Sequence, residues 1–284
     1  GGEMKFFVGG GALLDIDLQR YYYAIGIPMY QGYGLSEATP IISANSPAKH
    51  IFGSSGKVVS PMEIKILDAD GVEQPFGKKG EICIKGENVM EGYWKNPKST
   101  TDTIVDGWLH TGDMGYMLNE EMLYVVGRFK SLLIAADGEK YSPEEIEENL
   151  VENSKYIDGV ILHNNQDPYT IALVTPNKEA FRAYAKRHGY EPESKEAKAK
   201  MLEKLQSEVN CYRKGGRLYG AFPERWLPAA VCVLPEPWTE QNHFLNSSMK
   251  VVRGRVEETY KANIEFAYTP EGKNIVNELN LASL

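Results

Sequence analysis

Residues 5–40, KFFVGGGALLDIDLQRYYYAIGIPMYQGYGLSEATP, contain two short apolar stretches that each run into a glycine-bearing loop. The first, Lys5–Val8, predicts a buried strand that is followed by the loop Gly9–Gly11 and by a helix over 13–25. The second predicts another strand with its own loop. Strand, loop, helix and strand is the order of an α/β layer, whose ligand sites lie at the carboxyl ends of the strands. We therefore expect residues 1–50 to be the end of an α/β layer.

Residues 51–127 have a different pattern, in which short runs such as EIKIL, GEICIKG and LYVVG alternate with turns. The turns fall at Asp70-Gly71, Phe76-Gly77 and Asp106-Gly107. Repeated short strands at roughly ten-residue spacing indicate an antiparallel sheet or barrel. We therefore expect an antiparallel β-barrel-like subdomain in this region.

Residues 128–284 show a mixed pattern that predicts an α+β domain. The sequence Ser142-Pro143-Glu144-Glu145 is a capping box with proline at the first helical position, so we expect a helix over 143–153. Further strands are expected over 159–162, 171–175 and 229–234. Further helices are expected over 179–188, ended by Gly189, and over 195–212, with Met201, Leu205 and Val209 on one face. A last helix is expected to start near Ser247 or Ser248 and to carry Val252, Val256 and Tyr260. The predicted fold class is multi-domain, α/β and α+β.

The composition argues against some classes of partner and favours a cytoplasmic location. The chain has 284 residues, with 31 Lys and Arg against 39 Asp and Glu, so its net charge is −8. This acidic balance without a basic block argues against a nucleic-acid partner. Three cysteines without a Cys-x-x-Cys spacing are typical of a reduced, cytoplasmic protein. The longest apolar stretch, around 227–235, is far shorter than the ~20 residues of a membrane-spanning helix.

The first residues lack the basic segment and apolar segment of a signal peptide. They also lack an initiator Met and lead almost directly into an apolar strand. We therefore expect the sequence to be an excerpt of a longer protein.

Three glycine-rich segments invite a phosphate-binding interpretation. The segment GSSGKVV (53–59) resembles a Walker loop, but that loop needs glycine at position 51 and Ser or Thr at 58, where this chain has Ile51 and Val58. A turn that feeds a strand is the better interpretation. The loop Gly9–Gly11 precedes a predicted helix, where backbone N–H groups can face a ligand, although an ordinary strand-to-helix turn explains it equally well. The segment 33–37, YGLSE, could stack a base and hold Mg²⁺, or be an ordinary N-capped turn.

Three later motifs add weight to a nucleotide site. The stretch WLHTGD places Asp113 after a tight turn, and an ionised Asp can accept hydrogen bonds from both hydroxyls of a ribose. The stretch GRFKSLL carries Arg128 and Lys130 where the strand-rich part joins the mixed part. Lys250 lies in NSSMKVVRGR near a predicted helix start, where a lysine is poorly placed for the helix dipole. A purely structural role for Lys250 is therefore less convincing.

Taken in order, six stretches of the chain resemble the adenylate-forming (AMP-binding) superfamily of acyl-CoA synthetases, luciferases and peptide-synthetase adenylation domains. They are FFVGGGALL, QGYGLSEATP, GEICIKGENVMEGYW, WLHTGDMGY, GRFKSLLIAADGEKYSPEEIE and NSSMKVVRGRV. The long segment between Asn177 and Pro228 and the ending Met-Lys-Val-Val-Arg look most like long-chain fatty-acyl-CoA synthetases. The resemblance implies that the chain is the C-terminal half of such an enzyme, with a small mobile C-terminal domain.

The resemblance also implies roles for residues of the first segment. Gly10 and Gly11 together with Tyr33 would enclose the adenine. Ser36 would approach the phosphate. Glu37 would bind Mg²⁺ and so take part in catalysis.

Further roles are implied for the rest of the chain. Asp113 and Arg128 would hold the ribose, and Lys130 would be the hinge about which the C-terminal domain turns. Lys250 would be the catalytic residue that bridges the substrate carboxylate and the α-phosphate. Gly138 would line the path of the CoA thiol.

This chain departs from the family pattern in three respects. Many relatives carry Arg where this chain has Met90-Glu91, and many synthetases have an acidic residue where it has Ser131. The larger departure is that the Ser/Thr/Gly-rich phosphate loop does not occur in the sequence. The isolated chain is therefore expected to be inactive. The five histidines show no ligand spacing such as His-x-x-x-His, so a zinc site is not expected.

The implied reaction consumes ATP with Mg²⁺, a carboxylic acid and coenzyme A. The acid, expected to be a long-chain fatty acid, would be converted to an acyl-adenylate and then transferred to CoA. Activation of an aryl acid or an amino acid, and a non-catalytic nucleotide-binding module, remain alternatives. Without a transmembrane segment, peripheral membrane contact stays open.

Overall fold

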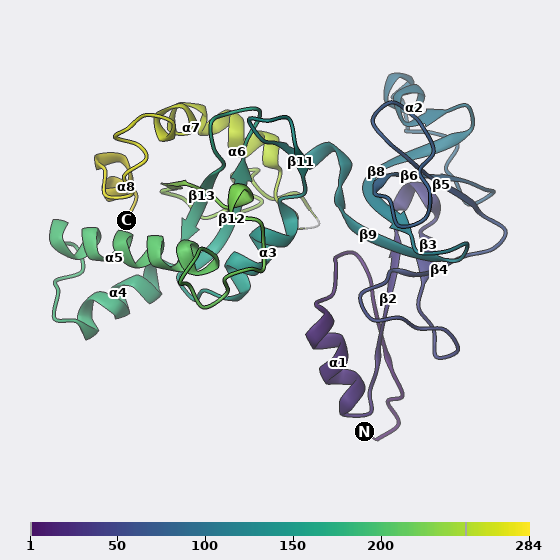
Figure 1. Cartoon of the computed structure of the whole chain (residues 1–284), viewed down its shortest axis with the longest axis horizontal. Helices are drawn as coiled ribbons and strands as arrows, with labels where there is room; N and C mark the ends of the chain where they lie inside the picture. Colours follow the sequence, from purple (N-terminus) through teal and green to yellow (C-terminus); the bar gives the residue numbers. More distant parts are fainter. Residues whose placement is uncertain (1, 248) are drawn as a thin grey trace. The chain divides into compact units, whose positions relative to one another are not determined.

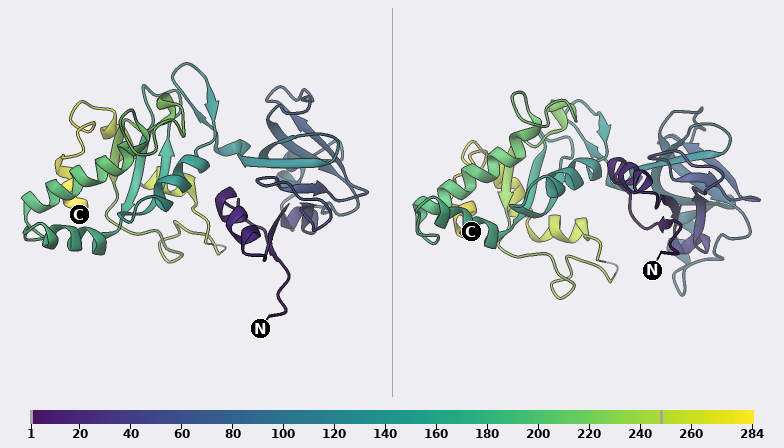
Figure 2. Two further views of the ribbon diagram at one scale, coloured as in Figure 1. Left: turned by 60° about the horizontal axis from the view of Figure 1, so that its bottom comes forward. Right: turned by 90° about the horizontal axis from the view of Figure 1, so that it is seen from below.

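The computed structural model describes residues 2–247 and 249–284, which form two compact units (Figures 1 and 2). Unit 1 is Gly1–Ser131 and unit 2 is Leu132–Leu284. The finer division expected from the sequence, at residues 50 and 127, stays a prediction. Each unit has its own hydrophobic core, so each is described by itself.

Unit 1 begins with the strand, loop, helix and strand that the sequence predicts. Strand β1 (Phe7–Gly9) leads through the glycine loop into helix α1 (Ile16–Ala24), and strand β2 (Met29–Gly34) follows. Asp15 is the N-cap of α1, and its carboxylate accepts the Leu18 N–H at 2.7 Å. Strands β1 and β2 pair in parallel, so both glycine-bearing loops leave the sheet at the same edge.

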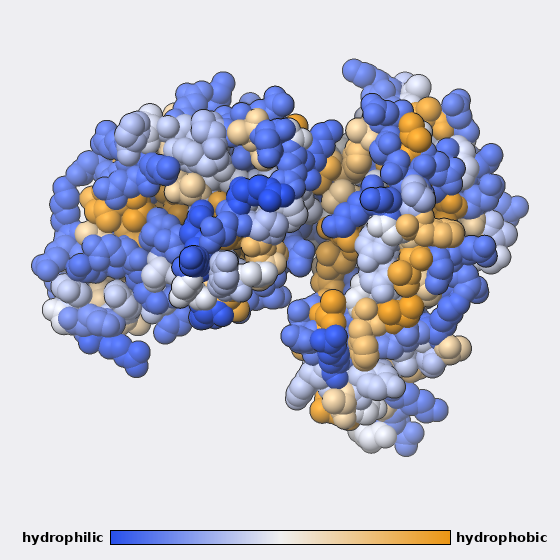
Figure 3. Space-filling model, in the orientation of Figure 1, coloured by the Kyte–Doolittle hydropathy of each residue, from blue (hydrophilic) through white to orange (hydrophobic). Residues whose placement is uncertain are grey.

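This first layer leaves large apolar side chains uncovered. Parallel strands are normally buried on both faces, yet Phe7 is 38% and Val8 is 71% exposed. Helix α1 likewise exposes Ile16 and Leu18. Figure 3 shows hydrophobic residues on the visible surface of unit 1. The layer thus presents an apolar surface that the described residues of unit 1 do not cover.

The strands of unit 1 continue into one open sheet. Its order is β1-β2-β3-β4-β9-β8-β6-β5, with β7 paired to β8. The pairs from β2 onward are antiparallel, as expected. Among the described residues the path does not return from β5 to β1, so the expected barrel is wrong. The remaining elements are β3 (Ile41–Ala44), β4 (Gly56–Val58), β5 (Glu63–Leu67), β6 (Gly80–Lys85), α2 (Pro97–Thr103), β7 (Ile104–Val105), β8 (Trp108–Met117) and β9 (Met122–Arg128).

Unit 2 is built on the three-stranded sheet β12 (Ile157–His163), β13 (Ile171–Pro176) and β14 (Ala230–Val233). Successive side chains of these strands alternate between two cores. Leu162 and Val174 pack in the core that includes helices α3, α4 and α5, and Ile161 and Leu173 pack in the core that includes α6 and α7. The helices are α3 (Glu144–Glu152), α4 (Lys178–Arg187), α5 (Lys195–Val209), α6 (Arg253–Thr259), α7 (Lys261–Ala267) and α8 (Glu278–Ser283), and a small sheet joins β10 (Leu133–Ile134) to β11 (Lys140–Tyr141).

The predicted helices of unit 2 are largely confirmed. Met201, Leu205 and Val209 are buried along α5. Gly189 follows α4 with φ +79°, the left-handed conformation of a glycine just beyond a helix end. The expected capping box is wrong, however. Pro143 stands at the N-cap position, which has no side-chain hydrogen bond, and the Ser142 hydroxyl donates to the Glu144 carboxylate instead.

The last predicted helix also starts later than expected. Helix α6 begins at Arg253 rather than near 247, and the expected alternative start at Ser248 lies outside the described residues. Met249 has φ +61°, which a helix does not accommodate. Lys250 therefore lies in a loop before the helix.

Candidate nucleotide site

Three residues predicted to hold the nucleoside lie together in unit 1. The Tyr33 hydroxyl, on β2, donates to Asp113 Oδ2 at 2.7 Å. Arg128 is the register partner of Asp113 across strands β8 and β9, and its Nε lies 3.1 Å from Oδ1. The fold thus brings a phenol, a carboxylate and a guanidinium to one place, although the sequence separates Tyr33 from Asp113 by 80 residues.

The position of Asp113 differs from the expectation in one detail. Asp113 lies inside strand β8 and not just after a turn. The strand is irregular there, because Gly112 has φ +71° and the register shifts between Met114 and Gly115. Thr111 supports this irregular strand, since its hydroxyl accepts the Asp113 N–H at 3.1 Å and donates to the Ile82 carbonyl at 2.8 Å. Sequence reasoning did not identify Thr111.

The electrostatics keep the Tyr33 hydroxyl neutral beside Asp113. Burial and the neighbouring Asp113 charge raise the pKa of the Tyr33 hydroxyl, so it keeps its proton and donates to the carboxylate. Asp113 is only 9% exposed, whereas the Arg128 side chain is 56% exposed. A carboxylate beside a hydroxyl donor and a guanidinium is the kind of group that accepts strong hydrogen bonds when ionised.

The first glycine loop is held by a buried glutamine. Gln31, which is 4% exposed, accepts the Leu14 N–H at 3.2 Å and donates to the Ala12 carbonyl at 3.3 Å. In the β1–β2 register Gln31 lies opposite Gly9, so the loop that contains Gly10 and Gly11 starts beside β2. Gly11 has φ +88°, a conformation that favours glycine. Sequence reasoning did not identify Gln31. The signal that could have found it is a polar residue within a predicted strand.

The second loop contains the two residues predicted to meet phosphate and metal. Ser36 is exposed at the start of a short 3₁₀ turn, and Glu37 is half-buried. Glu37 Oε1 accepts the Tyr93 hydroxyl at 2.9 Å, and the Glu37 carbonyl accepts the Met90 N–H at 2.8 Å. The carboxylate is thus oriented by the segment that contains Tyr93. Sequence reasoning included this segment in a family motif but gave Tyr93 no role.

Gly34 is required by the close return of the chain after this loop. The Leu35 N–H donates to the Pro40 carbonyl at 2.8 Å, and a side chain at Gly34 would overlap that same carbonyl group. Only glycine fits this approach. The Tyr-Gly-Leu-Ser-Glu segment is therefore a tightly closed loop at the end of β2.

The predicted catalytic lysine belongs to unit 2. Lys250 is exposed on a hairpin whose strands meet at the bridge between Leu245 and Val251. Asn246 closes the hairpin, because its side-chain Oδ1 accepts the Lys250 N–H and its own N–H donates to the Lys250 carbonyl, both at 2.9 Å. The hairpin ends where the Val252 N–H donates to the Phe244 carbonyl at 2.8 Å, and α6 follows. The lysine is therefore presented by a hydrogen-bonded turn.

Two other predicted residues, Lys130 and Gly138, lie at the end of unit 1 and near the start of unit 2. Lys130 is in the 3₁₀ turn Phe129–Ser131, the last residues of unit 1. Gly138, with φ +85°, lies in the turn between β10 and β11, and its N–H donates to the Ala135 carbonyl at 2.8 Å. The next residue, Glu139, accepts hydrogen bonds from Arg225 at 2.7 Å and Trp226 at 3.1 Å, which fix this turn on unit 2.

A group of potential metal ligands lies on the neighbouring strands β6 and β8. Ligand atoms of Glu81, Cys83 and His110 lie within 4.8 Å of one another, an arrangement that sequence spacing missed because the strand register places Cys83 opposite His110. Burial raises the pKa of the Cys83 thiol to about 12, which opposes the thiolate that a metal needs. Glu81 instead accepts hydrogen bonds from the Gly112 N–H at 3.1 Å and makes a 2.8 Å contact with His110. These residues support the strand that carries Asp113.

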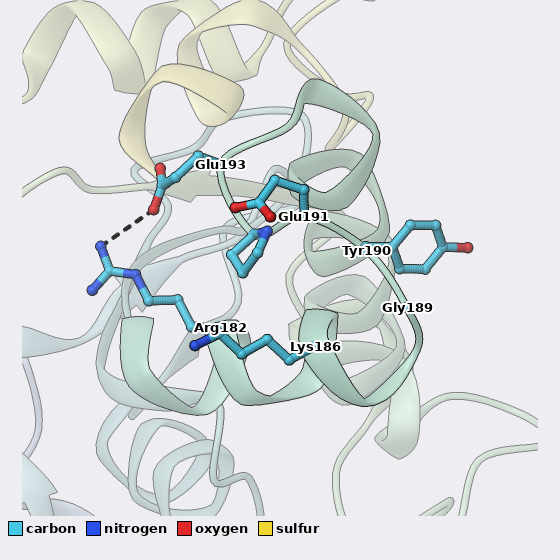
Figure 4. Close-up of a pocket in the computed structure, with 7 residues that line it drawn as sticks. Arg182, Lys186, Gly189, Tyr190, Glu191 and Glu193 are labelled. Atoms are coloured by element: carbon cyan, nitrogen blue, oxygen red, sulfur yellow. Dashed lines mark hydrogen bonds and ion pairs between the residues drawn. The ribbon is translucent and has the colours of Figure 1, made fainter.

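A separate depression lies on unit 2, where helix α4 ends. Figure 4 shows Arg182 paired with Glu193, at 3.4 Å, beside Lys186. Its lining is Arg182, Lys186, Gly189, Tyr190, Glu191, Pro192 and Glu193, which includes none of the predicted site residues. It is therefore separate from the candidate site.

The helices of the described part of the chain include none that is both long and apolar enough to span a bilayer.

Comparison with known proteins identifies relatives along almost the whole chain. Residues 1–94 match the family model described as AMP-binding enzyme. "Probable acyl-activating enzyme 16, chloroplastic" of Arabidopsis thaliana is 32% identical, over 94% of this chain and 38% of that protein. "Long-chain-fatty-acid–CoA ligase 5" of Rattus norvegicus is 31% identical, over 94% of this chain and 39% of that protein.

Among solved structures, O-succinylbenzoate CoA synthetase from Bacillus subtilis in complex with ATP and magnesium ion is similar, with a TM-score of 0.65 and 26% identity. The match covers 89% of this chain and 46% of that structure. The chain thus spans less than half the length of the relatives it matches. The matches confirm the resemblance that the motifs predicted: residues 1–94 match a family model of AMP-binding enzymes, and an acyl-activating enzyme and a long-chain-fatty-acid–CoA ligase are similar over most of the chain.

Proposed function

We propose that the chain supplies the nucleoside site and the catalytic lysine of an AMP-forming ligase, which activates a carboxylic acid with ATP and passes the acyl group to CoA. The observation that carries this proposal is the cluster of Tyr33, Asp113 and Arg128. An ionised, mostly buried carboxylate can accept both hydroxyls of a ribose, and the aromatic ring beside it can pack on the adenine. Gly10 and Gly11 would complete the adenine pocket.

In the first half-reaction an oxygen of the acid would attack the α-phosphorus of ATP. An acyl–oxygen–phosphorus bond forms, and pyrophosphate leaves. Negative charge gathers at the α-phosphate, and Lys250 would neutralise it while it binds the acid. A preorganised donor of this kind contributes roughly 10²–10³-fold in rate.

The residues of the second loop fit a magnesium ion. Glu37 is half-buried and offers a hard carboxylate oxygen, which is the ligand type that Mg²⁺ takes when it also binds nucleotide phosphates. When bound, the ion would neutralise phosphate charge. Glu37, oriented by Tyr93, would hold it, and Ser36 would lie against the phosphate.

In the second half-reaction the CoA thiol would attack the acyl carbonyl. A carbon–sulfur bond forms, AMP leaves, and the thiol proton passes to solvent. Lys250 is not needed for this step. We propose that the C-terminal domain turns about Lys130, which removes Lys250 and brings the turn at Gly138 to the thiol path.

The substrate acid is proposed to be a long-chain fatty acid, because the name of the rat relative specifies one. The Bacillus subtilis structure is named for an aryl acid, so an aryl or amino acid is the alternative substrate class. The location is proposed to be cytoplasmic, with peripheral membrane contact allowed. Pyrophosphate exchange with the complete protein, over a panel of fatty, aryl and amino acids, would separate these substrates. Exchange with none of them would favour a nucleotide-binding module without catalysis.

The isolated chain should not form thioesters, because its sequence lacks the Ser/Thr/Gly-rich loop that binds the β- and γ-phosphates in the family. It should still bind AMP weakly through Asp113. The test incubates the isolated chain with ATP, Mg²⁺, CoA and fatty acids and measures AMP release. Robust turnover would show that the chain needs no further segment.

A further inference from the structure

A buried ion pair joins three elements of unit 2 at the residue that follows the Lys250 hairpin. Arg253 Nη2, at the first residue of α6, lies 2.8 Å and 2.7 Å from the two carboxylate oxygens of Glu147 on α3. The Arg253 and Glu147 side chains are 20% and 11% exposed. Both residues also bind the end of β12, because the Leu162 carbonyl accepts Arg253 Nη1 at 2.7 Å and the Leu162 N–H donates to Glu147 at 2.5 Å.

The same face of α6 makes a second polar contact with β12. Glu257 lies one turn after Arg253, and its carboxylate is 2.9 Å from His163 Nδ1. His163 also lies 3.6 Å from Asp167. Helix α6 therefore contacts two consecutive residues of β12: Arg253 binds Leu162, and Glu257 binds His163.

No side-chain cap fixes the start of α6, but its first residue, Arg253, ties it to β12 and α3. Val252 is the N-cap residue of α6 and offers no side-chain hydrogen bond. The hairpin that presents Lys250 ends at this same residue. The base of the Lys250 hairpin is therefore held to the sheet by the Arg253 side chain on one side and by the buried Phe244 on the other.

Stability alone explains such a pair poorly. Desolvation of two charges offsets most of their attraction, so a buried ion pair adds little net stability compared with apolar residues of similar size. What the pair does supply is one defined geometry, because the planar guanidinium meets Glu147 through Nη2 and the Leu162 carbonyl through Nη1, and few orientations satisfy both partners.

We propose that Glu147 and Arg253 are positioning residues for the adenylation half-reaction, which hold the base of the hairpin so that Lys250 reaches the α-phosphate. This inference rests on the function proposed above for Lys250. A small displacement of a catalytic group costs up to about 10²-fold in rate. The second half-reaction, which does not use Lys250, should not depend on the pair.

The experiment uses the complete protein and measures each half-reaction separately. Pyrophosphate exchange reports adenylation, and synthetic acyl-adenylate with CoA reports thioester formation. Glu147→Gln should lower the kcat of adenylation about 10- to 100-fold with little change in the KM for ATP. Thioester formation should stay near normal. Glu193→Gln, which breaks the exposed pair with Arg182 on the same unit, is the matched control and should leave both rates unchanged.

A double-mutant comparison distinguishes positioning from general support of the fold. If Glu147 acts through Lys250, Glu147→Gln should cause little further loss of adenylation in a Lys250→Ala background. Arg253→Lys keeps the charge but loses the planar group that reaches Glu147 and the Leu162 carbonyl together. It should reproduce the selective loss at temperatures below its melting transition. These variants are therefore informative even if Glu147→Gln unfolds.

Each contrary result has a distinct meaning. Suppose that Lys250→Ala slows adenylation as expected. Equal loss of both half-reactions in Glu147→Gln and Arg253→Lys, or loss in neither, would then overturn the positioning role. If Lys250→Ala itself left adenylation unchanged, the proposed function of Lys250 would fail first.

Discussion

Replacement of Asp113 by Asn tests the nucleoside site in both half-reactions. The change keeps the size of the side chain but removes its charge and one acceptor oxygen. In the structure this carboxylate accepts the Tyr33 hydroxyl at 2.7 Å and faces Arg128 Nε at 3.1 Å. In the complex it would also accept the ribose hydroxyls. We therefore expect weaker binding of ATP in adenylation and of the acyl-adenylate in thioester formation.

The size of the effect follows from the hydrogen bonds that are lost. A hydrogen bond to a charged group contributes about 1.5–3 kcal/mol. Loss of one such bond to ribose should raise the apparent KM for ATP roughly 10- to 100-fold. The hydroxyl of Tyr33 supports the same carboxylate, so Tyr33→Phe should have a smaller effect in the same direction.

The assay measures the KM for ATP in pyrophosphate exchange by the complete protein, together with a thermal melt. Asp102→Asn is a suitable control, because it removes one negative charge from an exposed position on helix α2. It should leave the KM for ATP unchanged. If Asp113→Asn also leaves it unchanged while the protein stays folded, Asp113 serves the strand alone and the nucleoside site lies elsewhere.

Two further predictions concern reactivity and stability. Burial raises the pKa of the Cys83 and Cys232 thiols to about 12 and also raises the pKa of the Cys211 thiol. A thiol reagent at pH 8 should therefore label the native protein slowly and should label three thiols after unfolding. Rapid labelling of the native protein would contradict this. Gly189→Ala should lower the free energy of unfolding of unit 2 by about 1 kcal/mol, because φ is +79° there and the position is otherwise open. Urea unfolding measures this loss, and an unchanged midpoint would refute the strain argument.

The sequence selected the residues of the candidate nucleoside site, but it did not predict how they are arranged. Tyr33, Asp113 and Arg128 were identified by motifs in a fixed order, and the structure brings them together. Their contact could not be derived from spacing, because it depends on the pairing of β8 with β9 and on the path of β2. Gln31 and Thr111 were missed because their partners are backbone groups of other segments.

The errors in the fold prediction have a similar origin. Short strands between turns predict antiparallel pairing, but they do not show which strands form the edges. Strand β4 pairs with β9 on one side and with β3 on the other. This pairing connects the antiparallel strands to the α/β layer and leaves an open sheet where a barrel was expected. The helix start near 247 was wrong because Met249 adopts a positive φ and Asn246 closes a turn around it, and neither signal is visible in the residue pattern.

The most direct test of the proposed function is to time the two half-reactions of the Lys250→Ala variant of the complete protein, with its thermal melt as the control for folding. Lys250 is exposed on a turn, so the substitution should leave the melting temperature nearly unchanged. Pyrophosphate exchange should fall by roughly 10²–10³-fold, because the charge at the α-phosphate is no longer neutralised. Thioester formation from synthetic acyl-adenylate and CoA should continue at nearly the normal rate. Equal loss in both half-reactions, or loss in neither, would contradict the assignment of Lys250 to adenylation.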